Sequence, residues 1–207
     1  NVEIRYNFET TEPGPTSILY TKPFQVGSTT TVNARCFRDG KPVSGTATRV
    51  FVKENPLPAV ALKGRKAPKQ GIAYRYYEGK WDSLPDFQSL KPVKAGVLSD
   101  FLFTPRREEE RFGFDYQGLV LIPETTEYTF YTGSDDGSCL WIDDKLVVNN
   151  NGLHGQQEKQ GNIALEKGYH RIRVAFFEAT GSDNLVVSVR SQASAKSILP
   201  NEWLFTE

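Results

Sequence analysis

The chain has 207 residues, with 25 Lys or Arg and 25 Asp or Glu, so its formal net charge is zero at pH 7. Nucleic-acid-binding proteins normally show a basic excess or stripe, so this balance argues against a nucleic-acid partner. No apolar run approaches the ~20 residues of a membrane span, and no signal peptide is recognised at Asn1. The length predicts one or two domains, and an aromatic content of 12% is enough for β-type cores.

The sequence contains no Met and begins directly in a strand-like run, Val2 to Phe8. We therefore expect a processed or excised piece of a longer protein. The two cysteines, Cys36 and Cys139, lie in separate strand-like segments and lack the spacing of a disulfide framework. This pattern predicts two free, buried thiols and does not fix the redox compartment.

Residues 1–53 are predicted to form short strands separated by turns. The segment 29–37 is the strongest strand because it is rich in Thr, Val and Phe. An Asp-Gly hairpin turn is predicted over 38–41. Residues 54–70 contain three prolines and four Lys or Arg, which predicts an extended linker.

The second unit begins at Gly71 and is also predicted to be built from strands. Residues 78–105 are predicted to be an ordered but irregular loop, and the charged run 106–111 a solvated loop or single helical turn. The expected strands are 72–77, 112–122, 127–131, 139–142, 146–148, 161–165, 169–177 and 185–190. Short strands without a long helical period predict an all-β sandwich or barrel.

Apolar residues alternate in two of these regions, which predicts that they share one buried face. The first set is Tyr128, Phe130, Leu140 and Ile142. The second set is Ile172, Val174 and Phe176, with Arg171, Arg173 and Ala175 on the opposite face. The apolar tail 198–205 is expected to dock on the sandwich.

The acidic loop Ser134–Ser138 lies at the centre of the second unit. Asp135 and Asp136 place two carboxylates at a strand end, next to Gly137, which can adopt positive φ. Oxygen-rich loops of this kind suit a hard cation such as calcium. The alternative is a polar turn that caps a hairpin through hydrogen bonds from its Asp side chains.

Other candidate ligand-binding side chains have structural alternatives. His154 lies in a Gly-flanked loop, where it either contacts a ligand or orders its own loop, and His170 is expected to be half-buried at a strand start. Trp81, Trp141 and Trp203 either stack on sugars or belong to the core. The sequence contains no zinc-protease, Cys-x-x-Cys, P-loop or Gly-x-Ser-x-Gly motif, so no catalytic residue is assigned.

The first unit contains a recognisable set of short motifs: Arg5-Tyr6, Glu12-Pro13, Leu19 to Phe24, Thr30 to Val32, Ala34 to Gly40, and Ser44. On these residues it resembles the small β-sandwich at the ends of chitobiase and β-hexosaminidase chains. It departs from that family at Glu9-Thr10, where Asp-Gly is usual. The resemblance implies a fibronectin-like accessory module with no catalytic residue to transfer.

The second unit carries a longer set of motifs: Gly71 to Trp81, Phe112 to Gly118, Ile122-Pro123, Tyr128 to Phe130, Ser134 to Ser138, Trp141 to Val147, Asn151 to Gly155, Gly168 to Arg173, and Phe177 to Ala179. On these residues 71–206 resemble the PA-14 domain family. This family is a β-sandwich inserted in, or appended to, glycosidases, adhesins, toxins and other secreted proteins. The implied fold of the whole chain is a small fibronectin- or immunoglobulin-like β-sandwich followed by a larger antiparallel one.

The resemblance also implies a binding site. In lectin members, two adjacent aspartates joined by a cis peptide ligate calcium, which binds vicinal sugar hydroxyls. A second loop supplies an Asn ligand, and Glu178 occupies that position here. The implied calcium ligands are Asp135, Asp136 and Glu178, and the implied carbohydrate-binding residues are Asp135, Asp136, His154, Asp183 and Asn184.

The resemblances together predict a non-catalytic, carbohydrate-binding accessory region of a secreted glycoside hydrolase, with a β-N-acetylhexosaminidase as the expected parent. The expected partners are a glycan and the catalytic domain of that parent. The expected location is secreted, periplasmic or at the cell surface. Two alternatives remain: a calcium-dependent lectin or adhesin module, and a purely structural spacer.

Overall fold

A computed structural model describes residues 1–62, 64 and 66–206. The chain divides into two compact units, Asn1–Asn55 and Pro56–Glu207. All pairings between the named strands of the described residues are antiparallel, and the two helices found there are 3₁₀ helices of three residues each. The predicted all-β class is therefore confirmed. Among the described residues, no helix has the length and apolar character needed to cross a membrane.

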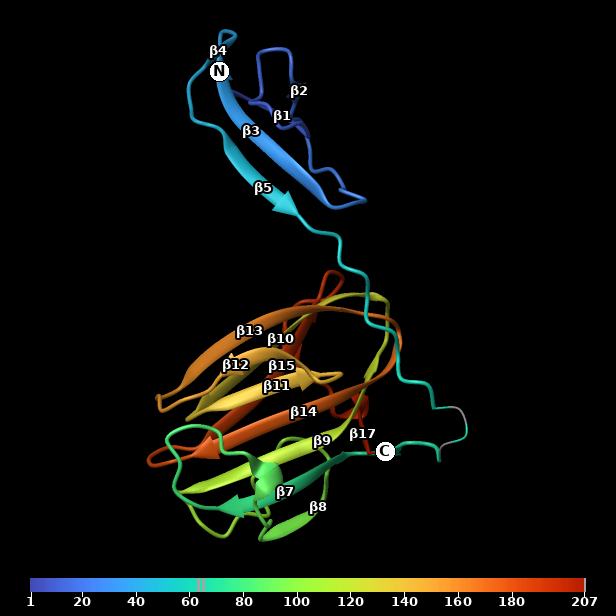
Figure 1. Ribbon diagram of the computed structural model, residues 1–207, viewed down its shortest axis with the longest axis vertical. Helices are drawn as coiled ribbons and strands as arrows, with labels where there is room; N and C mark the ends of the chain where they lie inside the picture. Colours follow the sequence, from blue (N-terminus) through green and yellow to red (C-terminus); the bar gives the residue numbers. More distant parts are fainter. Residues whose placement is uncertain (63, 65, 207) are drawn as a thin grey trace. The chain divides into compact units, whose positions relative to one another are not determined.

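The first unit is a five-stranded sheet with a long central strand (Figure 1). Its strands are β1 (Glu3–Asn7), β2 (Ile18–Leu19), β3 (Thr30–Arg38), β4 (Lys41–Pro42) and β5 (Ala47–Phe51). The sheet order is β2-β1-β3-β4, and β5 also pairs with β3. The predicted hairpin turn after β3 is confirmed, because Asp39 and Gly40 both adopt positive φ.

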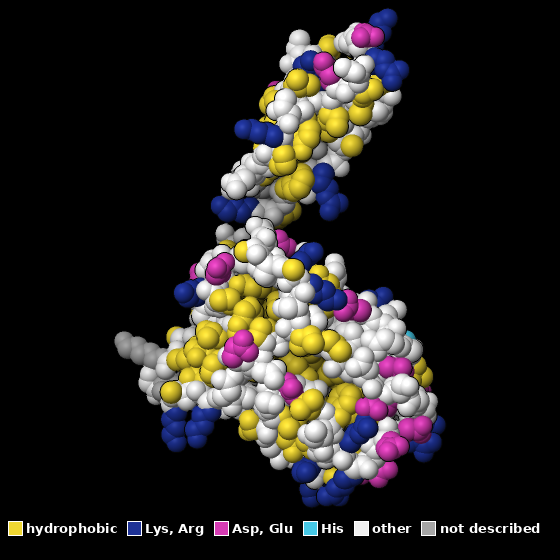
Figure 2. All heavy atoms as spheres, turned by 180° about the vertical axis from the view of Figure 1, so that it is seen from behind, with side chains coloured by type: hydrophobic (Ala, Val, Ile, Leu, Met, Phe, Trp, Pro, Cys, Tyr) yellow, Lys and Arg dark blue, Asp and Glu magenta, His cyan; other side chains and the backbone are white. Residues whose placement is uncertain are grey.

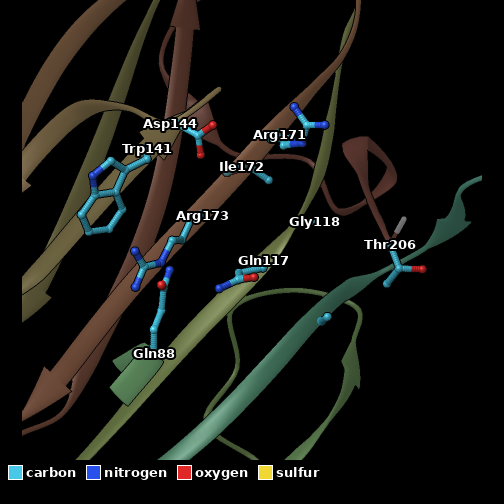
Figure 3. A pocket seen from close by; sticks show the side chains of 10 residues that line it. Gln88, Gln117, Gly118, Trp141, Asp144, Arg171, Ile172, Arg173 and Thr206 are labelled. Carbon is cyan, nitrogen blue, oxygen red and sulfur yellow. The ribbon is translucent and has the colours of Figure 1, made fainter. Parts of the chain in front are cut away.

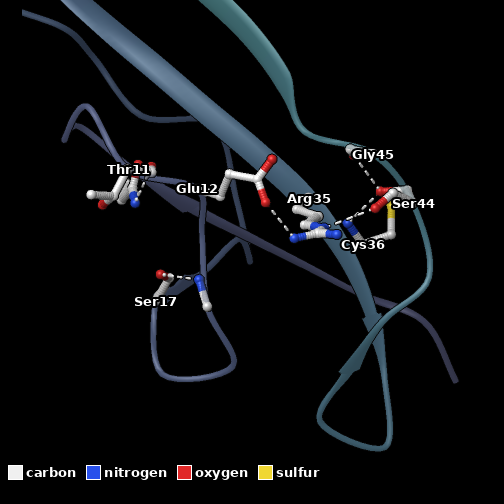
Figure 4. Close-up of polar contacts among 9 residues, drawn as sticks. Thr11, Glu12, Ser17, Arg35, Cys36, Ser44 and Gly45 are labelled. Atoms are coloured by element: carbon white, nitrogen blue, oxygen red, sulfur yellow. Dashed lines mark hydrogen bonds and ion pairs between the residues drawn. The ribbon is translucent and has the colours of Figure 1, made fainter.

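Polar contacts tie the loops of the first unit to its central strand (Figure 4). The guanidinium of Arg35 donates to Glu12 Oε2 at 2.7 Å and to the carbonyl of Ser44 at 2.8 Å. The hydroxyl of Ser44 accepts from the amide of Cys36 at 2.9 Å. These contacts are made by residues on which the family resemblance of this unit rests.

One face of the first unit exposes apolar side chains (Figure 2). Tyr6 stacks on Phe24 with ring centroids 4.6 Å apart, and Phe8 packs edge-on against both rings. Phe8 is nevertheless 47% exposed and Phe24 39% exposed. A single small sheet therefore buries only part of its aromatic surface.

The second unit contains two sheets that enclose one core (Figure 1). The four-stranded sheet has the order β13 (Gln157–Leu165), β10 (Thr126–Asp135), β15 (Asn184–Ser191), β16 (Ser197–Ile198). The eight-stranded sheet runs β12 (Lys145–Asn150), β11 (Ser138–Ile142), β14 (Gly168–Glu178), β9 (Phe112–Ile122), β17 (Leu204–Thr206), β6 (Lys69–Gln70). Two further strands extend this sheet beside β9: β7 (Ile72–Glu78) and β8 (Lys94–Leu98).

The core of this sandwich follows the predicted alternation. Both predicted apolar sets belong to one buried cluster, so the two face assignments are confirmed. The tail docks as expected, since Leu199 and Leu204 are buried in the same cluster. Both cysteines are free thiols as predicted, and Cys139 is buried, but the prediction that Cys36 is buried is wrong because it is only half-buried in the single sheet of the first unit.

Two sequence predictions about connectivity are wrong. The acidic loop does not cap a hairpin, because β10 belongs to the four-stranded sheet and β11 to the eight-stranded sheet. Residues 78–105 are not wholly irregular, since they contain β8 and the helix η1 (Phe87–Ser89). The strand β8 pairs with the edge of β7, and its burial is too slight to produce an apolar alternation.

The described part of the predicted linker from Pro56 onward belongs to the second unit. Leu57 donates to the carbonyl of Ala164 and accepts from the amide of Glu166, both at 2.9 Å. Residues 69–70 form β6, which pairs with β17. Residues 63 and 65 of this segment lie outside the described part of the chain.

Candidate metal centre

One end of the sandwich core is polar rather than apolar. In β10, β11, β12 and β14, every second side chain faces the core. Along each strand these inward-facing side chains change from apolar to polar toward the same end. The buried polar residues at this end are Thr132, Ser134, Asp136, Ser138, Asn150 and Glu178, each exposed by 6% or less. The two sheets therefore enclose a polar site between their ends.

A hydrogen-bonded network supports the acidic loop from beneath. The hydroxyl of Ser134 donates to the carbonyl of Asp136 at 2.6 Å and lies 2.7 Å from the hydroxyl of Ser138. The amide of Asn150 donates to Ser134 Oγ and to the carbonyl of Gln157, both at 3.1 Å. Because these groups are buried, the hydrogen bonds between them fix the loop that connects the two sheets.

Asp136 is held by two backbone amides from different loops. Its Oδ1 accepts from the amide of His154 at 2.9 Å, and its Oδ2 accepts from the amide of Ala179 at 3.0 Å. The peptide bond between Asp135 and Asp136 is cis, as the family resemblance implies. Asp136 thus joins the β10–β11 crossover to the β12–β13 loop and to the end of β14.

Glu178 completes the acidic group. It continues the inward-facing row Ile172, Val174, Phe176 on β14 and is fully buried. Neither of its carboxylate oxygens has a hydrogen-bond partner among the described residues. Oxygens of Asp135, Asp136 and Glu178 all lie within 4.8 Å of one another.

The environment of Glu178 disfavours its charge. Burial, followed by the carboxylates of Asp136 and Asp135, raises the pKa of Glu178 to about 8. The backbone amide of Asp136 opposes this shift without reversing it, so the buried carboxylate remains costly, and two further carboxylates beside it increase the cost. A bound cation would remove both penalties.

The chemistry of the group fits calcium. All three side chains offer oxygen, which is the ligand type of hard cations. Calcium takes six to eight oxygen ligands, so three carboxylates leave positions for carbonyls, water or ligand hydroxyls. The described residues therefore fit an open calcium site.

Gly137 in the acidic loop is needed for a reason other than the positive φ that was predicted. Gly137 does not have positive φ. It is required by close approach, since a Cβ there would lie 2.4 Å from Cε1 of Phe177 and 2.9 Å from the backbone nitrogen of Gly152. Its carbonyl also accepts from the amide of Phe177 at 3.0 Å, which anchors the crossover to β14.

The other predicted site residues surround the acidic group. Asn184 is the register partner of Asp135, and its amide donates to Gln156 Oε1 at 2.9 Å. Asp183 forms an ion pair with Arg106 and also contributes to the raised pKa of Glu178. All the predicted residues therefore lie at this end of the sandwich.

His154 serves its own loop in this structure. Its Nδ1 lies 2.9 Å from the carbonyl of Gly155, and its Nε2 lies 3.0 Å from the carbonyl of Asn150. Both ring nitrogens are thus occupied by backbone, and the contact with Asp136 comes from the amide. The ring orders the loop that supports Asp136.

The prediction of a half-buried His170 is wrong. This side chain is fully buried, with Nδ1 2.6 Å from Asp143 Oδ2 and Nε2 2.8 Å from the carbonyl of Glu166. Burial alone lowers the pKa of His170, but Asp143 and the Glu166 carbonyl raise it above its ordinary value. His170 anchors the β11–β12 turn and lies outside the acidic group.

Sequence reasoning missed the polar supports of the site. The hydrogen bond from Asn150 to Ser134 was not predicted, because Asn150 lies at a strand end among several other Asn residues. The ion pair of Arg106 was hidden because its run is highly charged and its partner is distant in sequence. The alternation of β10 and β14, extended by one step, would have placed Asp136 and Glu178 inside.

Known protein families match both units. Residues 68–203 match the PA14 domain, and residues 1–51 match the family described as Fn3 associated. The anti-sigma-I factor RsgI3 of Acetivibrio thermocellus is 26% identical over 147 residues, which cover 68% of this chain and 22% of that protein. The chain therefore spans about a fifth of the length of this curated relative.

Solved structures share the fold. An anti-sigma factor domain-containing protein aligns with a TM-score of 0.60 and 15% identity, covering 100% of this chain and 76% of its own. A PA14 sugar-binding domain from an RTX adhesin aligns with a TM-score of 0.56 and 16% identity, covering 67% of this chain and 99% of its own. At these identities the likeness establishes the fold, so the PA14-type sandwich is confirmed.

Proposed function

Because the chain belongs to the PA14 domain family, we propose that it is a non-catalytic, calcium-dependent carbohydrate-binding region of a longer extracellular or surface-exposed protein. Asp135, Asp136 and Glu178 hold the ion, and vicinal hydroxyls of a glycan complete its coordination. The loops that carry His154, Asp183 and Asn184 border the bound sugar.

Glu178 is the observation that carries this proposal. The carboxylate of Glu178 is fully buried, and neither of its oxygens has a hydrogen-bond partner among the described residues. Buried polar groups of proteins normally have a partner, so such a group indicates a bound ion, water or ligand. Because it faces two further carboxylates, a cation would satisfy all three side chains at once. Glu178 replaces an amide ligand of adhesin sites, and its additional charge favours tighter calcium binding.

The printed titles of similar proteins support a ligand-recognition role. The RTX adhesin domain is described as sugar-binding. The curated relative is an anti-sigma-I factor, which favours a second candidate for the whole protein: a regulator in which this region recognises an external glycan. In either setting the region binds rather than catalyses.

The nature of the parent protein is a separate part of the proposal. The first unit's resemblance to the end domain of chitobiase and β-hexosaminidase supports a glycoside hydrolase, specifically a β-N-acetylhexosaminidase. The match to the Fn3 associated family is compatible with an accessory module beside a catalytic domain. Activity of the full-length protein on chitin oligosaccharides would separate this parent from a regulator.

The calcium site is tested first by calorimetric titration of the chain with calcium. We expect one site per chain, and loss of uptake in Asp135→Ala. A glycan array is then screened with calcium and with chelator. Chelator-sensitive glycan binding supports the proposal, whereas calcium uptake without glycan binding, or no uptake, would contradict it.

A further inference from the structure

A second concave site lies on the outer face of the eight-stranded sheet. A cavity of about 560 Å³ opens there and is lined by side chains from β11, β14, β9 and η1 (Figure 3). This volume lies within the ~300–1,000 Å³ of small-molecule sites. The residues used in the argument below are Gln88, Gln117, Trp141, Asp144, Arg171 and Arg173.

The floor of the cavity is a row of side chains that crosses four strands. Trp141 on β11 is in register with Arg173 on β14, which is in register with Gln117 on β9 and then with Ala73 on β7. Neighbouring strands are ~4.8 Å apart, so the row extends for about 14 Å across the sheet. An elongated ligand matches this shape better than a compact one.

The row is held rigid by contacts of its own. The guanidinium of Arg173 lies 4.8 Å from the ring centroid of Trp141, and its Nε donates to Asp115 Oδ1 at 2.6 Å. Gln117 Nε2 donates to Asp115 Oδ2 at 2.6 Å. Because Asp115 lies two residues from Gln117 on the same face of β9 and is only 1% exposed, it holds both side chains from the side of the row. A preorganised floor lowers the entropic cost of ligand binding.

The charges around the cavity cancel. The charged lining residues are Arg171, Arg173 and Asp144, and the charge of Arg173 is offset by its ion pair with Asp115 beside the cavity. Such a balance favours a neutral ligand over an anionic or cationic one. The lining nevertheless offers amide, guanidinium and carboxylate groups, which donate to and accept from hydroxyls.

From these observations we infer that the outer groove binds a neutral oligosaccharide chain without calcium. Trp141 contacts the apolar C–H surface of a sugar ring, and Gln88, Gln117 and Asp144 exchange hydrogen bonds with its hydroxyls. The groove is distinct from the metal centre, because Arg173 faces outward and lies five residues, or about 16 Å along the strand, from inward-facing Glu178. The inference does not depend on the proposed calcium site.

The test uses calorimetry with cellohexaose, xylohexaose, mannohexaose and chitohexaose in the presence of EDTA, which keeps the metal centre empty. We expect at least one hexasaccharide to bind, and Trp141→Ala to weaken it at least tenfold. Gln88 is exposed, so Gln88→Ala leaves the fold intact and is expected to weaken binding several-fold. The matched control is Gln160→Ala, the same substitution at an exposed position of β13, which leaves the affinity unchanged.

Two results would overturn the inference: no binding of any of these hexasaccharides in EDTA, or binding that Gln88→Ala and a folded Trp141→Ala leave unchanged. Asp135→Ala separates this test from that of the proposed function. It abolishes chelator-sensitive binding at the metal centre and leaves EDTA-resistant binding in the groove unaltered. Failure of either site is therefore visible without failure of the other.

Discussion

An Asp-Asp dipeptide precedes the strand β11 and another follows it, and the two have different structural roles. Asp135-Asp136 precedes it and Asp143-Asp144 follows it. The second pair forms a tight turn between β11 and β12, in which both residues have positive φ. The first pair instead carries the chain from one sheet to the other.

Their surroundings explain the difference. Asp143 faces donors, because its carboxylate pairs with His170 and accepts from the amide of Arg171 at 2.8 Å. Asp136 also accepts two amides, but together with Asp135 it faces the unpartnered carboxylate of Glu178. Asp143 has its partners within the protein, whereas the Asp135-Asp136 pair lacks a positive charge. The neighbours of each aspartate thus decide whether it is structural or ligand-binding.

The largest effect is expected at the crossover. Asp136→Ala removes two hydrogen bonds to a charged acceptor, each worth about 1.5–3 kcal/mol, so we expect it to lower the free energy of unfolding by about 3 kcal/mol and to abolish calcium binding. Urea unfolding in EDTA and calcium titration measure the two effects. The matched control is Asp135→Ala. Both variants abolish calcium binding and relieve repulsion on Glu178, but only Asp136→Ala loses the two amide hydrogen bonds, so Asp135→Ala leaves the calcium-free stability at least as high. Equal destabilisation by both variants would contradict this division of roles.

At the hairpin, stability and calcium binding are expected to separate. Asp143→Ala leaves a fully buried His170 and the amide of Arg171 without their acceptor, which costs about 3 kcal/mol. Calcium affinity stays at the wild-type value, because the turn contributes no ligand. A loss of calcium binding in a folded variant would show that the two dipeptides are coupled.

The close approach at Gly137 gives a smaller effect. Gly137→Ala forces a Cβ against Phe177 and the backbone of Gly152, and overpacking of this kind costs about 1–3 kcal/mol. Gly155→Ala is the control, because its Cβ would meet nothing within 4 Å. Thermal melts of the two variants should differ by several degrees, and identical melting temperatures would contradict the tight packing of the crossover.

Calcium binding is expected to release a proton. With its pKa raised to about 8, Glu178 is mostly protonated at pH 7 and must ionise to bind the ion. Calcium affinity should therefore rise by up to about tenfold per pH unit below pH 8. Titrations in buffers of different ionisation enthalpy count the proton, and Glu178→Gln should release none. A release of no proton by the wild type would contradict the raised pKa.

The last prediction concerns the stability of the calcium-free protein against pH. The raised pKa of Glu178 contributes stability that is present below its ordinary value of about 4.3 and lost as pH rises through about 8. The raised pKa of His170 acts in the same direction, with stability present below about 6.5 and lost at higher pH. Unfolding between pH 4 and 9 should show both losses, Glu178→Gln should remove the first, and saturating calcium should suppress it. A stability that rises across this range in EDTA would contradict both assignments.

The sequence allowed much of this molecule to be predicted, for a definite physical reason. Strand β9 was predicted with its observed bounds, and the buried faces of β10, β11 and β14 were predicted residue by residue, because alternation is a local signal. Asp135 and Asp136 were candidates from the acidic loop itself, and Glu178 was added by the family resemblance. Their convergence within 4.8 Å was implied by that resemblance and not by local pattern.

What escaped prediction depends on contacts between distant segments. The alternation around the acidic loop is the same for a hairpin as for a crossover, so the sequence did not reveal that β10 and β11 lie in different sheets. The burial of His170 follows from its pairing with Asp143 across a turn. The role of Gly137 follows from Phe177 and Gly152, which meet it only in the folded chain.

The crossover at Ser134–Ser138 gives the bound ion a mechanical meaning. An ion held by Asp135 and Asp136 at the end of one sheet and by Glu178 at the end of the other would act as a rivet between the two layers. In a longer protein fixed at one end and attached to a solid substrate at the other, this link between the sheets would bear tension. Its resistance to force would then increase with the external calcium concentration. Such a region would resist unfolding under force at high calcium concentration and unfold at lower force where calcium is scarce.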